Sequence, residues 1–243
     1  MACAPVHRKV EAMPTATKVS ITATDRITAI AYAPPKKDRL PVSIVLGHGA
    51  GANQTSKFMV QIASDLAERG IGCLTFNFLY TERERKLPDR NDALELCYRR
   101  VIEAWHAGQF RTLGEGNLVI GGKSMGGRIA SQVAAKGGVD IAGLVFLGYP
   151  LHPPGNPKKL RDAHLSSIRE PMLFIQGAKD AFGTPEELRP ILKRLKAPVE
   201  LCPVEEADHS LKVPKKATRS QAEVDAFVRD TIEGWIRGTV LVR

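Results

Sequence analysis

Residues 119–127, VIGGKSMGG, contain a serine flanked by glycines, and the stretch fits two incompatible kinds of chemistry. Gly122, Lys123 and Ser124 match the end of a phosphate-binding P-loop, G-x-x-x-x-G-K-[ST]. The residues from Gly122 to Gly126 also match G-x-S-x-G, the sharp turn that presents a nucleophilic serine. The choice decides whether the protein binds a nucleotide or attacks an acyl group.

Both nucleotide-binding alternatives fail on spacing. A P-loop requires glycine at position 117, where the chain has Asn117, and its loop would include residues 118–120, whose apolar side chains belong in a strand. A Rossmann motif fits Gly47, Gly49 and Ala52, but it needs a carboxylate about 20 residues later. Asn77 stands near that point. The serine-nucleophile interpretation remains, and no cofactor is expected.

A serine nucleophile needs an imidazole to take its proton and a carboxylate to orient the imidazole. Asp180 follows the apolar run 171–177 and lies 56 residues after Ser124. His209 follows the run 198–204 and lies 29 residues after Asp180. Serine, aspartate and histidine thus stand in the order of the α/β-hydrolase arrangement, each just after a strand. We predict a catalytic triad of Ser124, Asp180 and His209.

The negative charge that develops on the substrate oxygen needs two backbone N–H groups. One is expected from Met125, the residue after the nucleophile, and the other from the glycine-rich loop 48–51, HGAG. Glycines on both sides of Ala50 allow the backbone to approach a substrate there. The predicted oxyanion hole is therefore formed by Ala50 and Met125.

Several other polar residues are given structural interpretations. Asp208 adjoins His209, and neighbouring side chains rarely point the same way, so Asp208 is poorly placed to orient it. His48 is interpreted as a loop-shaping residue. His152 and His164 show no metal-ligand spacing, and no metal site is expected.

The surrounding chain alternates between strand and helix patterns. Residues 19–22 and 27–32 predict an N-terminal β-hairpin, after a flexible lead-in over residues 1–15. Apolar runs predict strands at residues 42–47, 71–80, 117–120, 142–150, 171–177 and 198–204. Helical spacing predicts helices over residues 58–67 and 92–107 and after Ser124, and capping boxes at Thr184 and Ser220 open two more. The prediction is one doubly wound α/β domain over residues 16–243, with a mostly parallel sheet.

Six motifs resemble the α/β-hydrolase superfamily, and within it a small lid-less group similar to dienelactone hydrolase, with the similarity running from about residue 41 to residue 209. They are LGHGAGAN, FNFLYTERERKLPDR, GGKSMGGRIA, LGYPLHPPG, LFIQGAKDAFG and ADHSL. Animal members of that group include a testis-expressed putative hydrolase and a histone-acetyltransferase complex subunit. The resemblance implies a serine-hydrolase fold with the same triad. Dienelactone hydrolases usually have a cysteine nucleophile, where this chain has Ser124.

Composition narrows the setting. The chain has 243 residues, 43% of them hydrophobic, and no apolar run long enough to cross a membrane. Its start lacks the apolar region of a secretion signal, and its four cysteines are scattered, which favours a reducing, cytoplasmic location. The chain has a net charge of +9, but it has no basic motif interleaved with aromatic residues, so no nucleic-acid partner is expected. The number of subunits stays open.

Substrate size and charge can also be anticipated. Only residues 151–170 separate two predicted strands, too few for the helical lid that covers long acyl chains. Lys123 and Arg83 are predicted to bind a small, anionic acyl substrate, since cations around a cleft attract anions. Further cations expected at the same edge are Arg85, Lys86, Arg90, Lys158, Lys159 and Lys212. The prediction is a serine hydrolase acting on a small ester or thioester; the alternative is a catalytically silent fold used for interactions.

Overall fold

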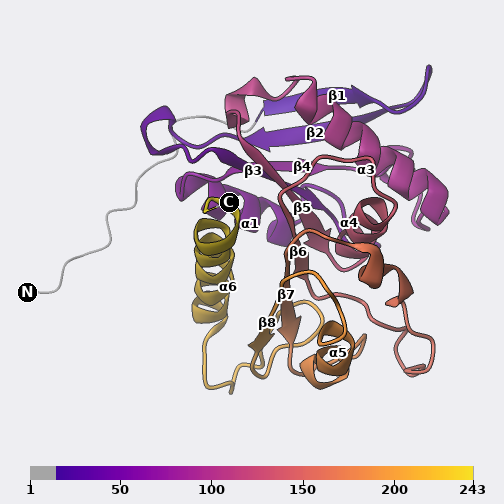
Figure 1. Cartoon of the computed structure of the whole chain (residues 1–243), viewed down its shortest axis with the longest axis vertical. Coiled ribbons are helices and arrows are strands. Elements are labelled where there is room, and N and C mark those ends of the chain that lie inside the picture. Colours follow the sequence, from indigo (N-terminus) through magenta and orange to yellow (C-terminus); the bar gives the residue numbers. More distant parts are fainter. Residues whose placement is uncertain (1–14, 243) are drawn as a thin grey trace, which may run out of the picture.

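The computed structural model describes residues 15–242, which form an eight-stranded sheet in the order β1-β2-β4-β3-β5-β6-β7-β8 (Figure 1). β1 pairs antiparallel with β2, and β2 pairs antiparallel with β4, whereas the remaining pairs are parallel. The strands are β1 Thr15–Ser20, β2 Arg26–Tyr32, β3 Val42–Gly47, β4 Gly72–Phe76, β5 Asn117–Lys123, β6 Gly143–Leu147, β7 Met172–Gly177 and β8 Val199–Val204. The predicted fold class, a mostly parallel sheet with an N-terminal hairpin, is confirmed.

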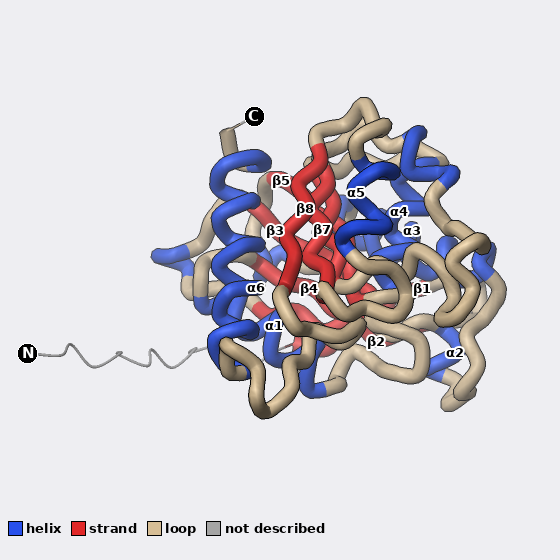
Figure 2. Tube along the Cα trace, turned by 90° about the horizontal axis from the view of Figure 1, so that it is seen from below, coloured by secondary structure: helices blue, strands red, loops and turns tan. Residues whose placement is uncertain are grey.

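Helices cover both faces of the sheet (Figure 2). α1 Lys57–Glu68 and α6 Gln221–Trp235 pack on one face, and α3 Asn91–His106, α4 Met125–Ala135 and α5 Pro185–Leu192 pack on the other. Each face has its own cluster of buried apolar side chains. Strands that are covered on both sides need apolar residues throughout. β3, VSIVLG, is such a strand, and every one of its residues is buried.

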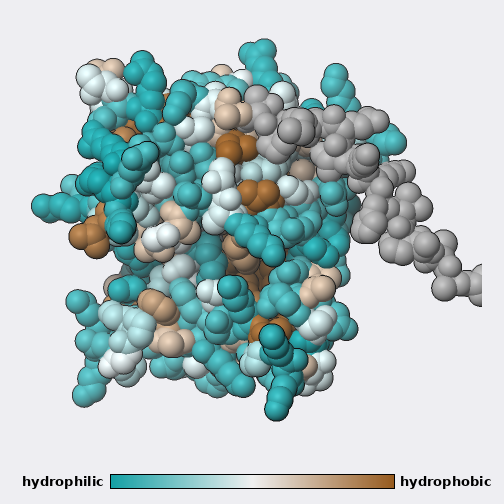
Figure 3. Space-filling model, turned by 180° about the vertical axis from the view of Figure 1, so that it is seen from behind, coloured by the Kyte–Doolittle hydropathy of each residue, from teal (hydrophilic) through white to brown (hydrophobic). Residues whose placement is uncertain are grey.

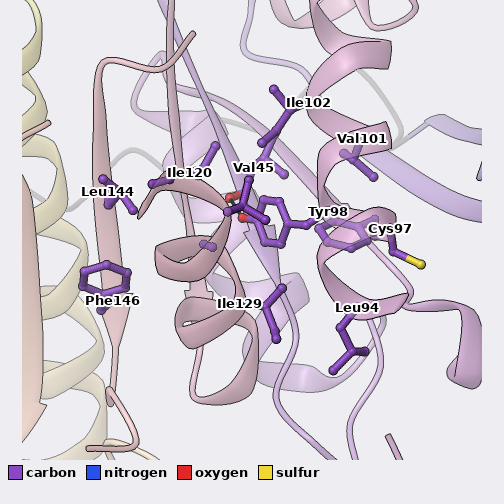
Figure 4. Packing of buried hydrophobic residues seen from close by; sticks show 14 of the residues in the cluster. Val45, Leu94, Cys97, Tyr98, Val101, Ile102, Ile120, Ile129, Leu144 and Phe146 are labelled. Carbon is purple, nitrogen blue, oxygen red and sulfur yellow. Dashed lines mark hydrogen bonds between the residues drawn. The ribbon is translucent and has the colours of Figure 1, made fainter. Parts of the chain in front are cut away.

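Tyr98 of α3 links two central strands from within the core (Figure 4). Its hydroxyl oxygen lies 2.8 Å from the carbonyl oxygen of Val45 and 2.6 Å from that of Gly121, and it accepts a hydrogen bond from the Gly121 N–H. Burying a hydroxyl costs free energy unless it is hydrogen-bonded. Tyr98 meets this condition and ties α3 to β3 and β5, and β5 leads directly to Ser124.

The N-terminal hairpin differs from the prediction in its first strand. β1 begins at Thr15, one residue inside the expected lead-in, and ends at Ser20. Thr22, expected at the end of the strand, lies in the turn, where its hydroxyl accepts hydrogen bonds from the N–H groups of Thr24 and Asp25. Threonine hydroxyls stabilise turns in this way, and this local bonding overrides the strand pattern. The rest of the lead-in, residues 1–14, lies outside the described residues.

The strand predicted over residues 71–80 is also shorter than expected. β4 ends at Phe76, and Leu79 and Tyr80 belong to a short helix, α2 Leu79–Glu82. A four-residue helix is too short to show helical periodicity. Both predicted capping boxes are present, at Thr184 with Glu187 and at Ser220 with Glu223.

The connection between β6 and β7 is short, as predicted. Its residues contain one 3₁₀ turn, Ala163–Ser167, and no α-helix, so no lid domain is inserted there. Over the described residues, no helix is long and apolar enough to cross a membrane.

A groove of about 410 Å³ runs between α1 and α6 and the loop that follows His209. Its lining includes Phe58, Ile62, Leu211 and Val213. Figure 3 shows the side of the molecule opposite to Figure 1, where apolar residues lie in a hollow among hydrophilic ones. The loop carrying His209 therefore has the groove and the helices α1 and α6 on one side, and the ends of the parallel strands on the other.

Candidate active site

Ser124 occupies a tight turn between β5 and α4, with φ 49° and ψ −114°. Non-glycine residues rarely adopt this conformation, and such strained residues cluster at functional sites. The turn brings two glycines against β3: a Cβ on Gly122 would lie 2.2 Å from the Gly47 carbonyl oxygen, and a Cβ on Gly126 would lie 2.1 Å from it. Only glycine fits at both positions, which explains the G-x-S-x-G pattern.

The side chains of Ser124, His209 and Asp180 form a continuous chain of hydrogen bonds. His209 Nε2 lies 2.7 Å from Ser124 Oγ. On the other side of the ring, His209 Nδ1 lies 2.9 and 2.8 Å from the two carboxylate oxygens of Asp180. With a proton on Nδ1, the imidazole donates to Asp180 and its Nε2 is free to accept the serine proton. The structure thus brings together all three residues of the predicted triad.

Asp180 is held in a closed environment. It is only 1% exposed, and its carboxylate accepts hydrogen bonds from the Phe182 N–H at 2.7 Å and from Gln176 Nε2 at 2.8 Å. The Phe182 ring stacks on the His209 imidazole, with the ring centroids 4.1 Å apart. Gln176 and Phe182 were not identified from the sequence. A buried glutamine within the apolar strand MLFIQG was the signal that could have revealed Gln176.

Lys123 lies next to Ser124 in the chain, but its side chain runs toward the loop after β8. Its ammonium group donates a hydrogen bond to the main-chain carbonyl of His209. Burial lowers the pKa of Lys123 to about 8, while Asp180 and Asp208 favour its charged form. The Lys123 ammonium group thus contacts the backbone of His209, and its contacts give no support to the predicted substrate-binding role.

Asp208 and His48 have the structural contacts expected of loop-shaping residues. Asp208 Oδ1 accepts hydrogen bonds from the N–H groups of Ser210 and Lys212, at 2.7 and 3.0 Å. His48 is fully buried, with Nδ1 2.8 Å from the Gly49 carbonyl oxygen and Nε2 accepting from the Phe78 N–H at 3.3 Å. Burial lowers the pKa of His48 to about 4, so its ring is neutral at pH 7.

The glycine-rich loop after β3 lies beside the candidate nucleophile. A Cβ placed on Gly49 would be 3.6 Å from Ser124 Cβ, and the next residue, Ala50, is exposed. Met125 is the first residue of α4, where backbone N–H groups lack partners within the helix. Both residues predicted for the oxyanion hole therefore flank Ser124.

Arg83 forms an ion pair with Asp25 of the hairpin turn. Its guanidinium is neutralised there, so we leave Arg83 out of the proposed substrate site. His152 Nε2 lies 3.3 Å from Glu187 Oε1, and His164 Nε2 lies 2.8 Å from Ser131 Oγ. Among residues 15–242, no three His, Cys, Asp or Glu side chains are grouped so as to hold a metal ion.

This arrangement can activate a serine hydroxyl. A short Ser–His contact, an ordered His–Asp pair and N–H groups beside the serine are the parts needed for nucleophilic attack on an acyl carbon. A neutral imidazole can accept one proton from Ser124 without any further rearrangement of the three side chains.

Comparison with protein families gives a match over residues 41–237 to a family described as an alpha/beta hydrolase domain. The matched stretch contains every residue of the Ser124, Asp180 and His209 cluster, together with the loop of Ala50.

Solved structures show the same fold at low sequence identity. A lid-less α/β serine hydrolase from Xanthomonas campestris is 20% identical, with 91% of this chain and 94% of that chain covered and a TM-score of 0.69. Dienelactone hydrolase from Anabaena variabilis is 18% identical, with 94% and 98% covered and a TM-score of 0.71. An esterase domain from Rhodothermus marinus is 15% identical, with 94% and 100% covered and a TM-score of 0.68.

Proposed function

The chain belongs to the alpha/beta hydrolase domain family, and from this premise we propose that it is a serine hydrolase that cleaves a small ester or thioester. The single observation that carries the proposal is the chain of hydrogen bonds from Asp180 through His209 to Ser124, with the serine held in a strained turn. The lid-less and esterase-like structural neighbours support the reaction class, and the short β6–β7 connection supports a small substrate.

The proposed reaction begins when Ser124 Oγ attacks the acyl carbon and its proton passes to His209 Nε2. Asp180 holds the Nδ1 proton and stabilises the imidazolium that forms. The tetrahedral oxygen accepts hydrogen bonds from the N–H groups of Met125 and Ala50. Collapse of this intermediate breaks the bond to the alcohol or thiol, which leaves with the proton from Nε2.

Water completes the proposed cycle. His209 Nε2 takes a proton from the water as its oxygen attacks the acyl carbon of the Ser124 ester, and the same oxyanion contacts form again. The second tetrahedral intermediate releases the carboxylic acid and returns the proton to Ser124 Oγ. No cofactor or metal ion enters this proposed cycle.

A fluorophosphonate probe, which phosphonylates activated serines, tests the proposal directly. We expect the folded protein to be labelled at Ser124, with the adduct located by mass spectrometry of peptides. Ser124→Ala and heat-unfolded wild-type protein serve as controls, and neither should be labelled.

An unlabelled Ser124 in folded protein would favour the other candidate, a catalytically silent fold used as an interaction module. The free thiols of Cys73, Cys97 and Cys202 support the further proposal that the protein works in a reducing compartment such as the cytoplasm. We propose a small-molecule acyl substrate as its partner.

A further inference from the structure

The arginines predicted to attract anionic substrates are neutralised by nearby carboxylates. Arg83 pairs with Asp25, Arg85 with Asp89, and Arg90 lies 3.9 Å from Asp92. The lysines expected at the same edge, Lys86, Lys158, Lys159 and Lys212, are exposed. Water screens exposed charges, so these groups do not define a binding site.

Two arginines that were not predicted from the sequence differ from these residues in both exposure and pairing. Arg128 of α4 and Arg161 of the β6–β7 connection are half-buried, and neither forms an ion pair with a carboxylate of residues 15–242. Buried cations are normally paired, because removing a charge from water is costly unless an opposite charge compensates. The lack of a carboxylate partner for Arg128 and Arg161 among the described residues therefore requires explanation.

Neutral oxygen atoms are the hydrogen-bond acceptors of Arg128. Its Nη1 donates to Gln132 Oε1 and its Nη2 to Asn91 Oδ1, both at 3.3 Å, longer than a strong charge-assisted bond. Burial and the charge of Arg161 both lower the pKa of Arg128. Glu95 favours the charged form, but its carboxylate is already bonded to Lys136.

Arg161 is anchored through its backbone, which leaves its guanidinium largely free. Its N–H donates to the Leu151 carbonyl at 2.8 Å, and its carbonyl accepts from the Tyr149 hydroxyl at 2.7 Å. Within residues 15–242, its side chain makes one long hydrogen bond, 3.5 Å from Nη1 to the Pro150 carbonyl oxygen. Most of the N–H groups of this guanidinium remain available to an acceptor.

Both arginines lie close to the candidate active site. The Arg128 N–H donates to the Ser124 carbonyl at 3.0 Å, so Arg128 lies one helical turn, about 6 Å along the axis, beyond the serine. Pro150, which Arg161 contacts, lies two residues after Gly148, and a Cβ on Gly148 would be 2.7 Å from the His209 carbonyl oxygen. The cation pair thus stands at the edge of the sheet that carries Ser124 and His209.

We propose that Arg128 and Arg161 form a subsite for the free carboxylate of a substrate whose ester or thioester carbonyl is attacked by Ser124. This inference rests on the proposed function and names its substrate class: half-esters of short dicarboxylic acids. Guanidinium groups bind carboxylates through paired N–H donors, and a charged ligand would supply the missing counter-charge. Arg128 follows Ser124 by a single helical turn, so the proposal names a short dicarboxylic half-ester.

The test compares monomethyl succinate with methyl butyrate, which has a similar length but no charge. We expect wild-type kcat/KM to favour the half-ester at least about tenfold, the value of one charge-assisted contact. Arg128→Gln and Arg161→Gln should each remove most of that preference through KM, and Arg128→Lys should keep part of it. Rates with methyl butyrate should stay near wild type, which shows that the variants fold.

Arg83→Gln is the matched control, because Arg83 is a paired arginine, and its preference should equal that of wild type. Binding of monomethyl succinate to Ser124→Ala, measured by calorimetry with and without Arg128→Gln, provides a readout that needs no catalysis. Hydrolysis of both esters with equal efficiency would overturn the subsite and leave the serine hydrolase standing. Arg128-dependent binding without hydrolysis of any ester would overturn the proposed function and leave the subsite standing. Absence of both preference and binding would overturn the subsite.

Discussion

The ammonium group of Lys123 donates a hydrogen bond to the main-chain carbonyl oxygen of His209, which joins the end of β5 to the loop after β8. The two residues are 86 positions apart in the chain. Lys123 precedes the candidate nucleophile and His209 contacts that nucleophile, so this contact fixes the loop from the side opposite to Ser124. A buried lysine in this position makes stability depend on pH.

Lys123 should make the free energy of unfolding depend on pH in the alkaline range. Burial lowers its pKa from 10.5 to about 8, so the unfolded chain binds more protons than the folded protein between these pH values. The free energy of unfolding of wild type should therefore rise relative to Lys123→Met from pH 8 to pH 10.5, by up to about 3 kcal/mol. Urea unfolding of both proteins at several pH values measures the difference, and a difference independent of pH would contradict the expectation.

His48 should make the free energy of unfolding depend on pH in the acidic range. Its pKa falls from 6.5 to about 4 on folding because the ring is buried. The unfolded chain binds more protons between pH 6.5 and pH 4, so wild type should lose up to about 3 kcal/mol relative to His48→Asn as the pH falls through this window. Denaturant unfolding from pH 7 to pH 4 tests this, and parallel curves for the two proteins would refute it.

Asp180 and Asp208 should differ sharply in catalysis. Asp180→Asn removes the carboxylate that orients His209, and turnover of a cleaved ester should fall by about 10³-fold or more because the imidazole takes the wrong tautomer. Asp208→Asn keeps an oxygen acceptor for the N–H groups of Ser210 and Lys212, so turnover should stay near wild type. Steady-state kinetics of both variants provide the test, and the reverse ranking would exclude Asp180 as the orienting acid.

Gly126 should be intolerant of the smallest side chain. A Cβ there would lie 2.1 Å from the Gly47 carbonyl oxygen, so Gly126→Ala must displace β3 or the turn of Ser124. We expect a loss of about 2 kcal/mol or more of unfolding free energy, together with loss of fluorophosphonate labelling.

Gly234 of α6 is the matched control, since no atom beyond its chain neighbours and its own helix backbone lies within 4 Å of its hypothetical Cβ. Alanine at this helical position should leave labelling intact and stabilise the protein by about 0.5–1 kcal/mol. Equal unfolding curves for the two alanine variants would show that the contact between Gly126 and β3 is unimportant.

The fold and the three central residues were predictable because both depend on local sequence. The helices opened by Thr184 and Ser220 are marked by capping boxes, which act within four residues. Ser124, Asp180 and His209 each follow an apolar run, and parallel strands bring such positions to one edge of a sheet. Their meeting could therefore be anticipated without any knowledge of individual contacts.

Contacts between distant side chains could not be predicted in the same way. Arg83 and Asp25 are 58 residues apart, and nothing in either segment indicates that they pair. Arg128 has the same residue type, yet no carboxylate of residues 15–242 forms an ion pair with it, because of how α3, α4 and the β6–β7 connection pack. The charge of a site depends on such pairings, so the sequence predicted the cations at this edge but not which of them are neutralised.

The position of β8 has a consequence for inactivation. In the described part of the chain, β8 is one of the two edge strands and pairs with β7 alone, and His209 follows it by five residues, whereas β5 and β7, which precede Ser124 and Asp180, lie inside the sheet. Outer segments open at lower free energy than the sheet interior. Mild denaturant should therefore detach the histidine while the serine and aspartate stay in place. Loss of activity would then precede loss of helical circular dichroism, so residual activity would report fraying of one strand rather than global unfolding.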